Sequence, residues 1–187
     1  MRTGVIACPV DPKLSYLKYE KFLTELNPKF IIDNLNQIVI NTNKDHINFL
    51  SQYNLDGIFL LLFSSGTTGK PKGILHKTKS LIDSAKSFSN LSELSRDSVV
   101  LHHFPMYYMA GLFNMFLCPM VSGSKIVIGN QFTKEHMLNF WEIPLKYGVN
   151  TLTLTPTMAI ALVKVYRENK RLHKYIRTIK SVISTGS

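Results

Sequence analysis

Short runs of apolar residues alternate with stretches of helical periodicity along this chain of 187 residues. Continuous apolar runs predict buried strands, because a strand of a parallel sheet is covered on both faces. We expect such strands at residues 4–10, 57–63, 99–102, 125–128 and 151–155, and a last one that begins at residue 181. Shorter strands are expected at 30–32 and 37–40, and the polar stretch 41–56 is expected to be a surface segment.

Apolar residues at helical spacing lie between these runs. They predict helices over residues 14–26, 81–88, 109–120 and 132–147. Gly148 is expected to end the last of these, and Pro156 to open the next helix in its first turn, where proline is tolerated. Strands that alternate with helices indicate an α/β fold with a largely parallel sheet flanked by helices. No repeat or linker divides the chain, so we expect one domain over residues 1–187.

The composition excludes several classes of protein. Hydrophobic residues make up 45% and charged residues 18% of the chain, which excludes a disordered protein. No apolar run approaches the ~18 residues of a membrane span, and the N-terminus is too short in apolar residues for a signal peptide. We therefore expect a cytoplasmic protein without a transmembrane segment. Cys8 and Cys118 have apolar neighbours and are interpreted as small buried thiols.

The formal net charge of +10 raises the question of an anionic partner. The basic residues concentrate in two groups, Lys70, Lys72, Lys77 and Lys79 in one, and Lys164, Arg167, Lys170, Arg171, Lys174, Arg177 and Lys180 in the other. In the second group, residues 164, 167, 171 and 174 are expected to share one helical face. This face is either a solvated surface or a patch for a phosphorylated partner such as coenzyme A or a nucleotide. No nucleic-acid partner is expected, because no aromatic residues interleave with the charges around the first group.

The most informative segment of the sequence spans ten residues. It reads Ser64, Ser65, Gly66, Thr67, Thr68, Gly69, Lys70, Pro71, Lys72, Gly73. Glycines let the backbone approach a ligand closely, and successive backbone N–H groups can surround an anion. Hydroxyl groups donate hydrogen bonds to phosphate oxygens, and lysine neutralises their charge. The segment therefore predicts a phosphate-binding loop that follows a buried strand.

The phosphate loop of nucleoside triphosphatases does not match this segment. That motif requires glycine where Ser64 stands and a metal-binding hydroxyl where Pro71 stands. It also requires a helix to begin at its Gly-Lys pair, and the sequence from Pro71 to Gly73 is a poor helix start.

The loop instead resembles the signature of the adenylate-forming superfamily, written [ST]-S-G-T-T-G-x-P-K-G, with Lys70 at the free position. The superfamily includes acyl- and aryl-CoA ligases, luciferases and the adenylation domains of peptide synthetases. Further segments resemble it in the same order, namely residues 4–12, 104–112, 147–157 and 183–187. The resemblance implies that the chain is part of the large N-terminal domain of such an enzyme.

The resemblance also implies a reaction and a set of ligands. A small carboxylic acid would attack the α-phosphate of ATP, and coenzyme A would then accept the acyl group. By the same resemblance, Ser65, Thr67, Thr68 and Lys72 would hold the β- and γ-phosphates with Mg²⁺, within a loop that also contains Ser64, Gly66, Gly69 and Gly73. Thr185, Gly186 and Ser187 would begin the site for adenine and acyl group, and Tyr108 and Gly111 would belong to the acyl pocket.

Two positions depart from the pattern of the superfamily. Tyr108 stands where many members have histidine, and a tyrosine hydroxyl does not become cationic near neutral pH. Thr78 stands where a second histidine often follows the loop. The acid that would be activated is therefore not specified by these positions. His102 and His103 are interpreted as residues at a strand end and not as metal ligands, so no metal site is expected within the chain.

The resemblance further implies that residues needed for catalysis are missing. A Tyr-Gly-x-Thr-Glu segment, an aspartate for the ribose and a lysine on a C-terminal domain would all follow Ser187. We therefore expect an internal fragment with no catalytic residue and no turnover by itself. Its truncated sheet edge is expected to expose apolar surface, to lower solubility and to be a candidate for association.

Two alternative functions stay open for the sequence. One is a non-catalytic fragment that binds a nucleotide or a partner. The other is an amino-acid-activating adenylation domain, which is less favoured because residues 104–108 lack the aspartate that usually holds the amine of the substrate.

Overall fold

The computed structural model describes residues 6–28, 31–32, 55–64 and 72–184. The strand expected at 37–40 and most of the surface segment 41–56 lie outside these residues. Residues 31 and 32 belong to neither a helix nor a strand, so no strand is seen there. Among the described residues, no helix is long and apolar enough to cross a membrane.

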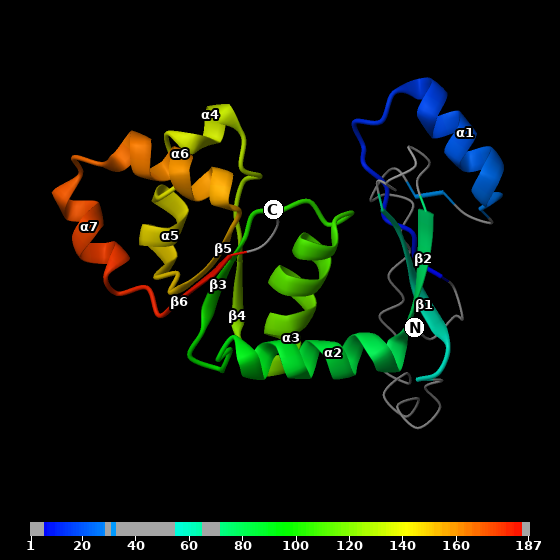
Figure 1. The fold of residues 1–187 in the computed structure, drawn as a ribbon, viewed down its shortest axis with the longest axis horizontal. Helices are drawn as coiled ribbons and strands as arrows, with labels where there is room; N and C mark the ends of the chain where they lie inside the picture. Colours follow the sequence, from blue (N-terminus) through cyan, green and yellow to red (C-terminus); the bar gives the residue numbers. More distant parts are fainter. Residues whose placement is uncertain (1–5, 29–30, 33–54, 65–71, 185–187) are drawn as a thin grey trace, which may run out of the picture.

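A parallel sheet of four strands forms the centre of the fold (Figure 1). Its strands are β3 (Val99–His102), β4 (Lys125–Ile128), β5 (Thr151–Leu154) and β6 (Ser181–Ser184), in the order β4-β3-β5-β6. All neighbouring pairs are parallel. The predicted α/β class with a parallel sheet is therefore confirmed, and all four strands begin at the expected residues. Strand β5 ends one residue earlier than expected because Thr155 caps the following helix.

The two faces of strand β3 define the two helical layers. Val100 packs with Ala85 and Cys118, which lie in α2 (Thr78–Leu91) and α3 (Cys118–Ser122). The next residue, Leu101, points to the opposite face and packs in a separate core with Trp141 and Leu162. That core is covered by α5 (Glu142–Tyr147), α6 (Pro156–Tyr166) and α7 (Lys170–Ile176), on the opposite side of the sheet from α2 and α3 (Figure 1).

Trp141 is the centre of the larger core. Its ring meets the rings of Phe140, Tyr166 and Tyr175 edge to face, with centroids 5.2, 6.5 and 6.2 Å away. The Tyr175 hydroxyl contacts the carbonyls of Pro144, at 2.9 Å, and Val149. These contacts join α6 and α7 to the segment around α5, so the layer behaves as one packed unit.

A separate antiparallel hairpin consists of β1 (Ile58–Ser64) and β2 (Lys72–Lys77). Residues 4–10 were expected to be a strand, and for the described residues 6–10 this is wrong. Only Ala7 pairs with β1, through hydrogen bonds of 2.9 Å to the Phe59 carbonyl and from the Leu61 amide. The physical reason is Pro9, which has no amide hydrogen to continue a ladder.

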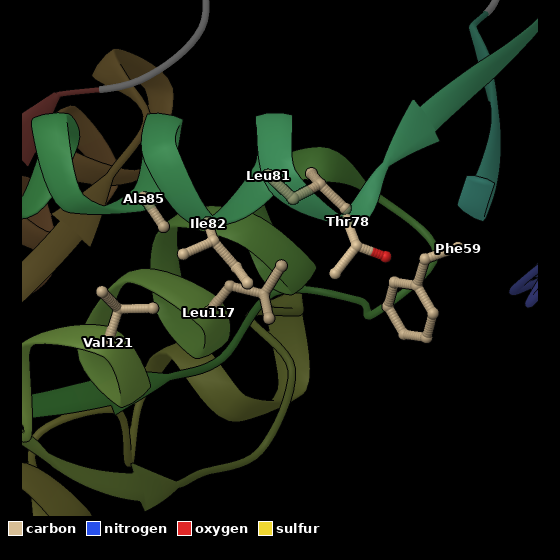
Figure 2. Close-up of a pocket in the computed structure, with 7 residues that line it drawn as sticks. All are labelled: Phe59, Thr78, Leu81, Ile82, Ala85, Leu117 and Val121. Atoms are coloured by element: carbon tan, nitrogen blue, oxygen red, sulfur yellow. The ribbon is translucent and has the colours of Figure 1, made fainter. Parts of the chain in front are cut away.

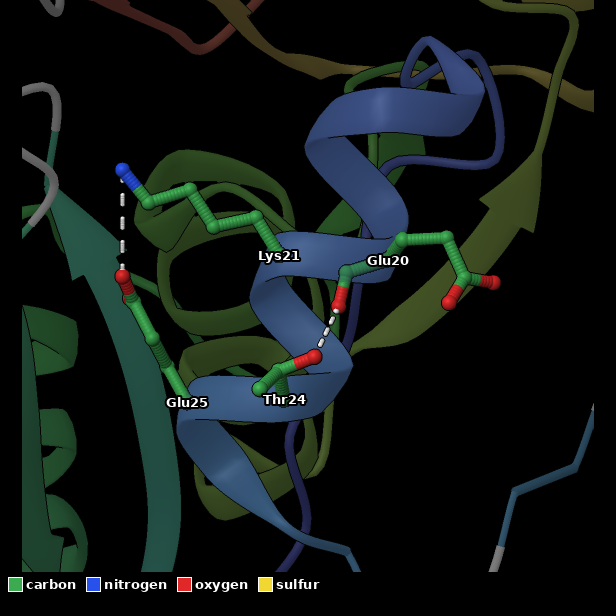
Figure 3. A network of polar contacts seen from close by, with 4 residues as sticks. All are labelled: Glu20, Lys21, Thr24 and Glu25. Carbon is green, nitrogen blue, oxygen red and sulfur yellow. Dashed lines mark hydrogen bonds and ion pairs between the residues drawn. The ribbon is translucent and has the colours of Figure 1, made fainter.

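Helix α1 (Tyr16–Leu26) confirms the helix predicted at 14–26, but it buries none of its residues. It contacts the hairpin through Phe22, whose ring centroid lies 4.6 Å from that of Phe63. Its surface carries a Lys21–Glu25 ion pair of 3.9 Å and a 2.9 Å hydrogen bond from Thr24 to the Glu20 carbonyl (Figure 3). Both interactions lie within α1 and do not attach it to the hairpin, and since the helix buries none of its residues it is weakly anchored.

The helix expected at 132–147 is two helices, α4 (Lys134–Met137) and α5 (Glu142–Tyr147). Pro144 explains the correction, because it lacks an amide hydrogen and its ring would clash with the carbonyl of Phe140 in a continuous helix. A new helix that starts at Glu142 places Pro144 in the first turn instead. Gly148 ends this helix with a φ of 63°, as expected.

The helix expected at 109–120 is also two elements, the π-helix η3 (Ala110–Leu117) and α3. Pro119 offers no amide hydrogen to the carbonyl four residues earlier, so the α-helical ladder cannot run through it. The segment is only partly buried, because Met120 is 56% exposed. Cys118 is buried, as expected, whereas Cys8 is only partly buried.

The predicted common helical face of residues 164, 167, 171 and 174 is wrong. Helix α6 ends at Tyr166, and α7 begins at Lys170 after a break. The Asn169 side chain causes the new start, because it accepts a 3.0 Å hydrogen bond from the Leu172 amide and caps α7.

We predict that the hairpin depends on one buried side chain. Leu60 is 1% exposed and packs with Leu62 and Leu81, so Leu60→Ala should lower the free energy of unfolding by about 2–5 kcal/mol. Ile58 on the same strand is 37% exposed, and Ile58→Ala should cost less than about 1 kcal/mol. Urea denaturation of both variants tests this difference, and equal losses would contradict the packing.

Candidate functional site

The candidate phosphate loop connects the two strands of the hairpin. Ser64, the last residue of β1, pairs with Lys72, the first residue of β2. The intervening residues Ser65, Gly66, Thr67, Thr68, Gly69, Lys70 and Pro71 lie outside the described residues, so their roles stay predictions. A strand, and not a helix, begins at Lys72. This confirms that the segment differs from the triphosphatase motif, whose loop leads directly into a helix.

The base of the loop is held by the packing of β1. Leu60 and Leu62 bury their side chains against Leu81 of α2, and Leu112 and Phe113 of η3 pack against this cluster. Gly73 lies opposite Phe63, and a Cβ at Gly73 would come within 3.0 Å of the Leu61 Cδ1 atom and 3.3 Å of the Phe63 ring. The absence of a side chain at Gly73 therefore leaves room for the side chains of β1.

Gly111 is fixed by the turn that precedes it. An ideal Cβ on Gly111 would lie 2.1 Å from the carbonyl oxygen of Pro105, far inside van der Waals contact. The same carbonyl accepts a 3.1 Å hydrogen bond from the Tyr108 amide. The chain therefore folds back tightly between Phe104 and Gly111, and only glycine permits this approach.

Tyr108 lies at the tip of this turn and is 61% exposed. Its ring centroid is 5.0 Å from that of Tyr107. Burial raises the pKa of Tyr107, and the nearby Asp11 carboxylate raises this pKa further. Asp11 thus connects residues 4–12 to residues 104–112, two of the segments that the resemblance selected. The structure does not show an acyl pocket at Tyr108, and that role stays a prediction.

Three candidate segments reach the same edge of the parallel sheet. Strands β3, β5 and β6 are neighbours and parallel, so their carboxyl ends meet at one edge. Phe104 follows β3, Thr155 follows β5, and Ser184 ends β6. Thr185, Gly186 and Ser187 lie outside the described residues. Open α/β sheets bind ligands at this edge, so the topology brings together the segments that the sequence singled out.

His103 is a buried polar residue at this edge, and the sequence did not indicate its burial. It follows the last residue of β3, as expected, and is 1% exposed. Among the described residues neither of its ring nitrogens has a hydrogen-bond partner, and its ring packs 4.8 Å from Phe104 and 5.5 Å from Phe140. Burial lowers the pKa of His103 from 6.5 to about 4, so the ring is neutral near pH 7.

His102 ends β3 and is also buried. Its Nε2 atom lies 3.0 Å from the sulfur of Met106, and burial lowers its pKa. Within the part of the chain that the structure describes, no three His, Cys, Asp or Glu side chains gather as a metal-binding group. The structural contacts given for the two rings are with neighbouring side chains, namely Met106 for His102 and the rings of Phe104 and Phe140 for His103.

Two hollows in the described structure lie away from these segments. One, of about 20 Å³, is lined by apolar side chains of α2, α3 and their neighbours, together with Thr78 (Figure 2). It can hold at most one water molecule, so it is a packing defect and not a substrate site. The other, of about 100 Å³, lies beside Gly129, Asn130, His136 and Glu142. Neither hollow is lined by a described residue of the candidate site.

A parallel sheet flanked by helices on both faces, beside an antiparallel hairpin, defines an α/β protein. The particular family follows from comparison with known sequences. The chain belongs to the AMP-binding enzyme family, whose family model matches residues 1–187.

Curated relatives of the chain are CoA ligases. A probable CoA ligase of Humulus lupulus is 28% identical over 72% of this chain and 23% of its own length. A 4-coumarate–CoA ligase of Narcissus pseudonarcissus is 32% identical over 65% of this chain and 21% of its own length. A mitochondrial malonate–CoA ligase of Homo sapiens is 27% identical over 57% of this chain and 19% of its own length. The chain therefore spans less than a quarter of each of these relatives.

Solved structures share the fold. A malonyl-CoA ligase in a ternary product complex with methylmalonyl-CoA and AMP has a TM-score of 0.77 and 20% identity, over 97% of this chain and 41% of its own. The ATP-bound MatB of Rhodopseudomonas palustris has a TM-score of 0.60 and 20% identity, over 72% of this chain and 25% of its own. These likenesses establish the α/β fold of the described residues.

We predict that Gly111→Ala destabilises the protein, because the new methyl group would collide with the backbone carbonyl of Pro105. The free energy of unfolding should fall by about 2 kcal/mol or more. Gly129→Ala is the matched control, since its nearest atom is a flexible side-chain carbon of Leu101 at 3.1 Å. Thermal unfolding of both variants measures the difference, and an unchanged Gly111→Ala protein would refute the tight turn.

We predict that His103 makes the protein less stable in acid. Its pKa is about 4 in the folded state and near 6.5 when unfolded, so only the unfolded state takes up the proton between these values. Its contribution is complete above pH 6.5 and falls as the pH approaches 4, by about 3 kcal/mol in total.

Urea midpoints between pH 4.5 and 7.5 test this dependence. His103→Leu should flatten the profile, and substitution of the exposed His173 by glutamine should leave it unchanged. Identical profiles for the His103→Leu variant and the parent protein would show that protonation of His103 does not lower the free energy of unfolding.

Proposed function

We propose that this chain supplies the ATP-phosphate loop of an AMP-forming acid–CoA ligase. In the complete protein, a carboxylate oxygen attacks the α-phosphorus of ATP, and the bond from that phosphorus to the pyrophosphate oxygen breaks. The thiolate of coenzyme A then attacks the acyl carbon, and the bond from this carbon to AMP breaks. The products are the acyl thioester, AMP and pyrophosphate.

One observation carries the proposal. The segment 64–73 carries every fixed residue of the adenylate-forming signature, and its ends are held together by the Ser64–Lys72 pairing of an antiparallel hairpin. Such a closure would bring the hydroxyl and amide groups of the intervening residues close together. Positioning and charge neutralisation of this kind are the main contributions that a protein makes to phosphate chemistry.

Ser65, Thr67 and Thr68 would donate hydrogen bonds to the β- and γ-phosphates, and Gly66 and Gly69 would allow the backbone to approach them. Lys72, at the exposed start of β2, would neutralise the charge of the leaving pyrophosphate. Mg²⁺ would be carried largely by the phosphates, as this ion commonly is in nucleotide sites. Thr185, Gly186 and Ser187 would continue from β6 toward adenine and the acyl group.

Coenzyme A is favoured as the acceptor because the curated relatives are CoA ligases. The acid would enter near Gly111 and the exposed Tyr108, whose hydroxyl can donate a hydrogen bond to a substrate oxygen. The share of the relatives that the chain covers supports its placement within a larger N-terminal domain. Catalytic groups of the complete enzyme would then come from the remaining sequence of that domain and its neighbour.

The experiment is acid-dependent exchange of radioactive pyrophosphate into ATP, measured on the complete protein with a panel of acids. Lys72→Gln should reduce the exchange by about tenfold to a hundredfold, because charge-assisted hydrogen bonds to phosphate are lost. This loss should appear mainly as a higher KM for ATP.

Lys77→Gln is the matched control for this experiment. Lys77 is exposed and lies at the opposite end of the same strand, so its substitution removes an equal charge without touching the loop. An equal loss in both variants would indicate a general charge effect and not a phosphate contact. Absence of exchange with every acid in the complete protein, despite calorimetric binding of ATP–Mg²⁺, would favour the non-catalytic alternative.

A further inference from the structure

The outer surface of α6 and α7 carries both aliphatic and basic side chains. Both helices pack their inner residues, Leu162 and Leu172, into the Trp141 core, so their opposite faces point away from the sheet. Helical spacing places Ile160 and Lys164 opposite Leu162 on α6, and Arg167 caps the end of this helix. On α7 the residues opposite Leu172 are Lys170 and Lys174, and Arg177 caps its end. We call these side chains and Val163 the outer α6–α7 surface.

This surface combines exposed aliphatic side chains with cations. Ile160 is 58% and Val163 is 65% exposed, and helix α6 buries only Leu162. A helix of mostly apolar residues normally turns such side chains toward a core. Here two neighbouring aliphatic residues face outward, and Lys164 and Arg167 flank them on the same face.

The charge of the surface is strongly one-sided. Between residues 156 and 180 the sequence contains seven lysine and arginine residues, and Glu168 is the only acidic residue. Glu168 pairs with Arg167 at 4.0 Å, but both side chains are almost fully exposed, at 95% and 82%. An ion pair this exposed is weak, so the surface keeps a large positive potential.

We propose that the outer α6–α7 surface binds the headgroup region of an anionic lipid membrane. The cations are spread over two helices instead of converging on one point, which suits a surface of many dispersed phosphates better than a single phosphate group. Ile160 and Val163 can enter the boundary between headgroups and acyl chains while the surrounding cations stay at the phosphates. An RNA partner fits less well, because aliphatic side chains offer no stacking platform for bases.

This binding surface is independent of the proposed ligase chemistry. It lies on the face of the sheet that Leu101 defines, whereas the hairpin packs on α2 and η3, beyond the opposite face. Substitutions on it can therefore be tested without altering the candidate phosphate loop.

The test is flotation of the full chain with vesicles in a density gradient, which separates membrane binding from aggregation. Vesicles of phosphatidylcholine alone are compared with vesicles that also contain phosphatidylglycerol. The protein should float only with the anionic vesicles, and added salt should release it. Flotation that is absent, or equal with both kinds of vesicle, would overturn the proposal.

Three variants sharpen the test. Replacement of Lys164, Arg167 and Lys174 by glutamine should lower the partition coefficient by about a hundredfold. The matched control replaces the exposed Lys18, Lys86 and Lys125, which lie on α1, α2 and β4, and should change the partition coefficient by less than about threefold. Ile160→Asn with Val163→Asn should lower the partition coefficient by about tenfold without changing the charge.

Circular dichroism establishes that each variant is folded before it is compared. Equal losses in the charge variant and its control would show that net charge alone acts, and this would overturn the specific surface. Binding of single-stranded RNA or of polyglutamate by a protein that does not float with anionic vesicles would assign the surface to another partner and overturn the membrane proposal.

Discussion

The burial of both faces of β3 is the constraint on which the described structure depends. Val100 and Leu101 are adjacent, 1% and 2% exposed, and face opposite ways, so the strand cannot be stable unless helices cover both sides. One side requires α2 and α3, and the other requires the layer built on Trp141. Parallel pairing with β4 and β5 follows, because each crossover must carry a covering helix. The carboxyl edge where the candidate segments meet is a consequence of that arrangement.

The hairpin is connected to this sheet through shared apolar contacts. Leu60 and Leu62 pack on Leu81 from α2, while Ala85 of the same helix packs on Val100 of β3. Helix α2 therefore packs against both the sheet and the hairpin, and so fixes the base of the candidate phosphate loop relative to the sheet. Leu112, which follows Gly111, packs against the same hairpin cluster. The loop and the turn from Phe104 to Gly111 thus share one apolar support, although they are distant in sequence.

The sequence predicts the strands of the sheet well because parallel strands that are buried on both faces appear as continuous apolar runs. The helices are predicted less well where one residue interrupts a good apolar period. Pro144 and Pro119 remove amide hydrogens, and Asn169 supplies a cap, so that three expected continuous helical surfaces are each divided. The strand predicted over residues 6–10 is wrong for a related reason, because Pro9 has no amide hydrogen to continue the hydrogen-bond ladder.

The part of the candidate site that the sequence predicts is the part that consists of a continuous local motif. The segment 64–73 combines glycine, hydroxyl and lysine in a fixed order. The apolar run before it predicts the strand that leads into it, whereas the strand that follows it, β2, was not predicted. The buried state of His103 was not predictable, because a histidine beside Phe104 has the same local sequence whether its ring points to solvent or to Phe140. The packing of Phe140, which lies between α4 and α5, against His103 decides this, and that contact joins distant parts of the chain.

The separation of the two helical layers also means that packing constrains their surfaces differently. The layer formed by α2, η3 and α3 must fit both the sheet and the hairpin, so its apolar residues have partners on two sides. The outward faces of α6 and α7 meet no described element and can change charge or polarity without disturbing the Trp141 core. The exposed Ile160 and Val163 add little to folding stability, and their position among cations suits contact with an anionic surface.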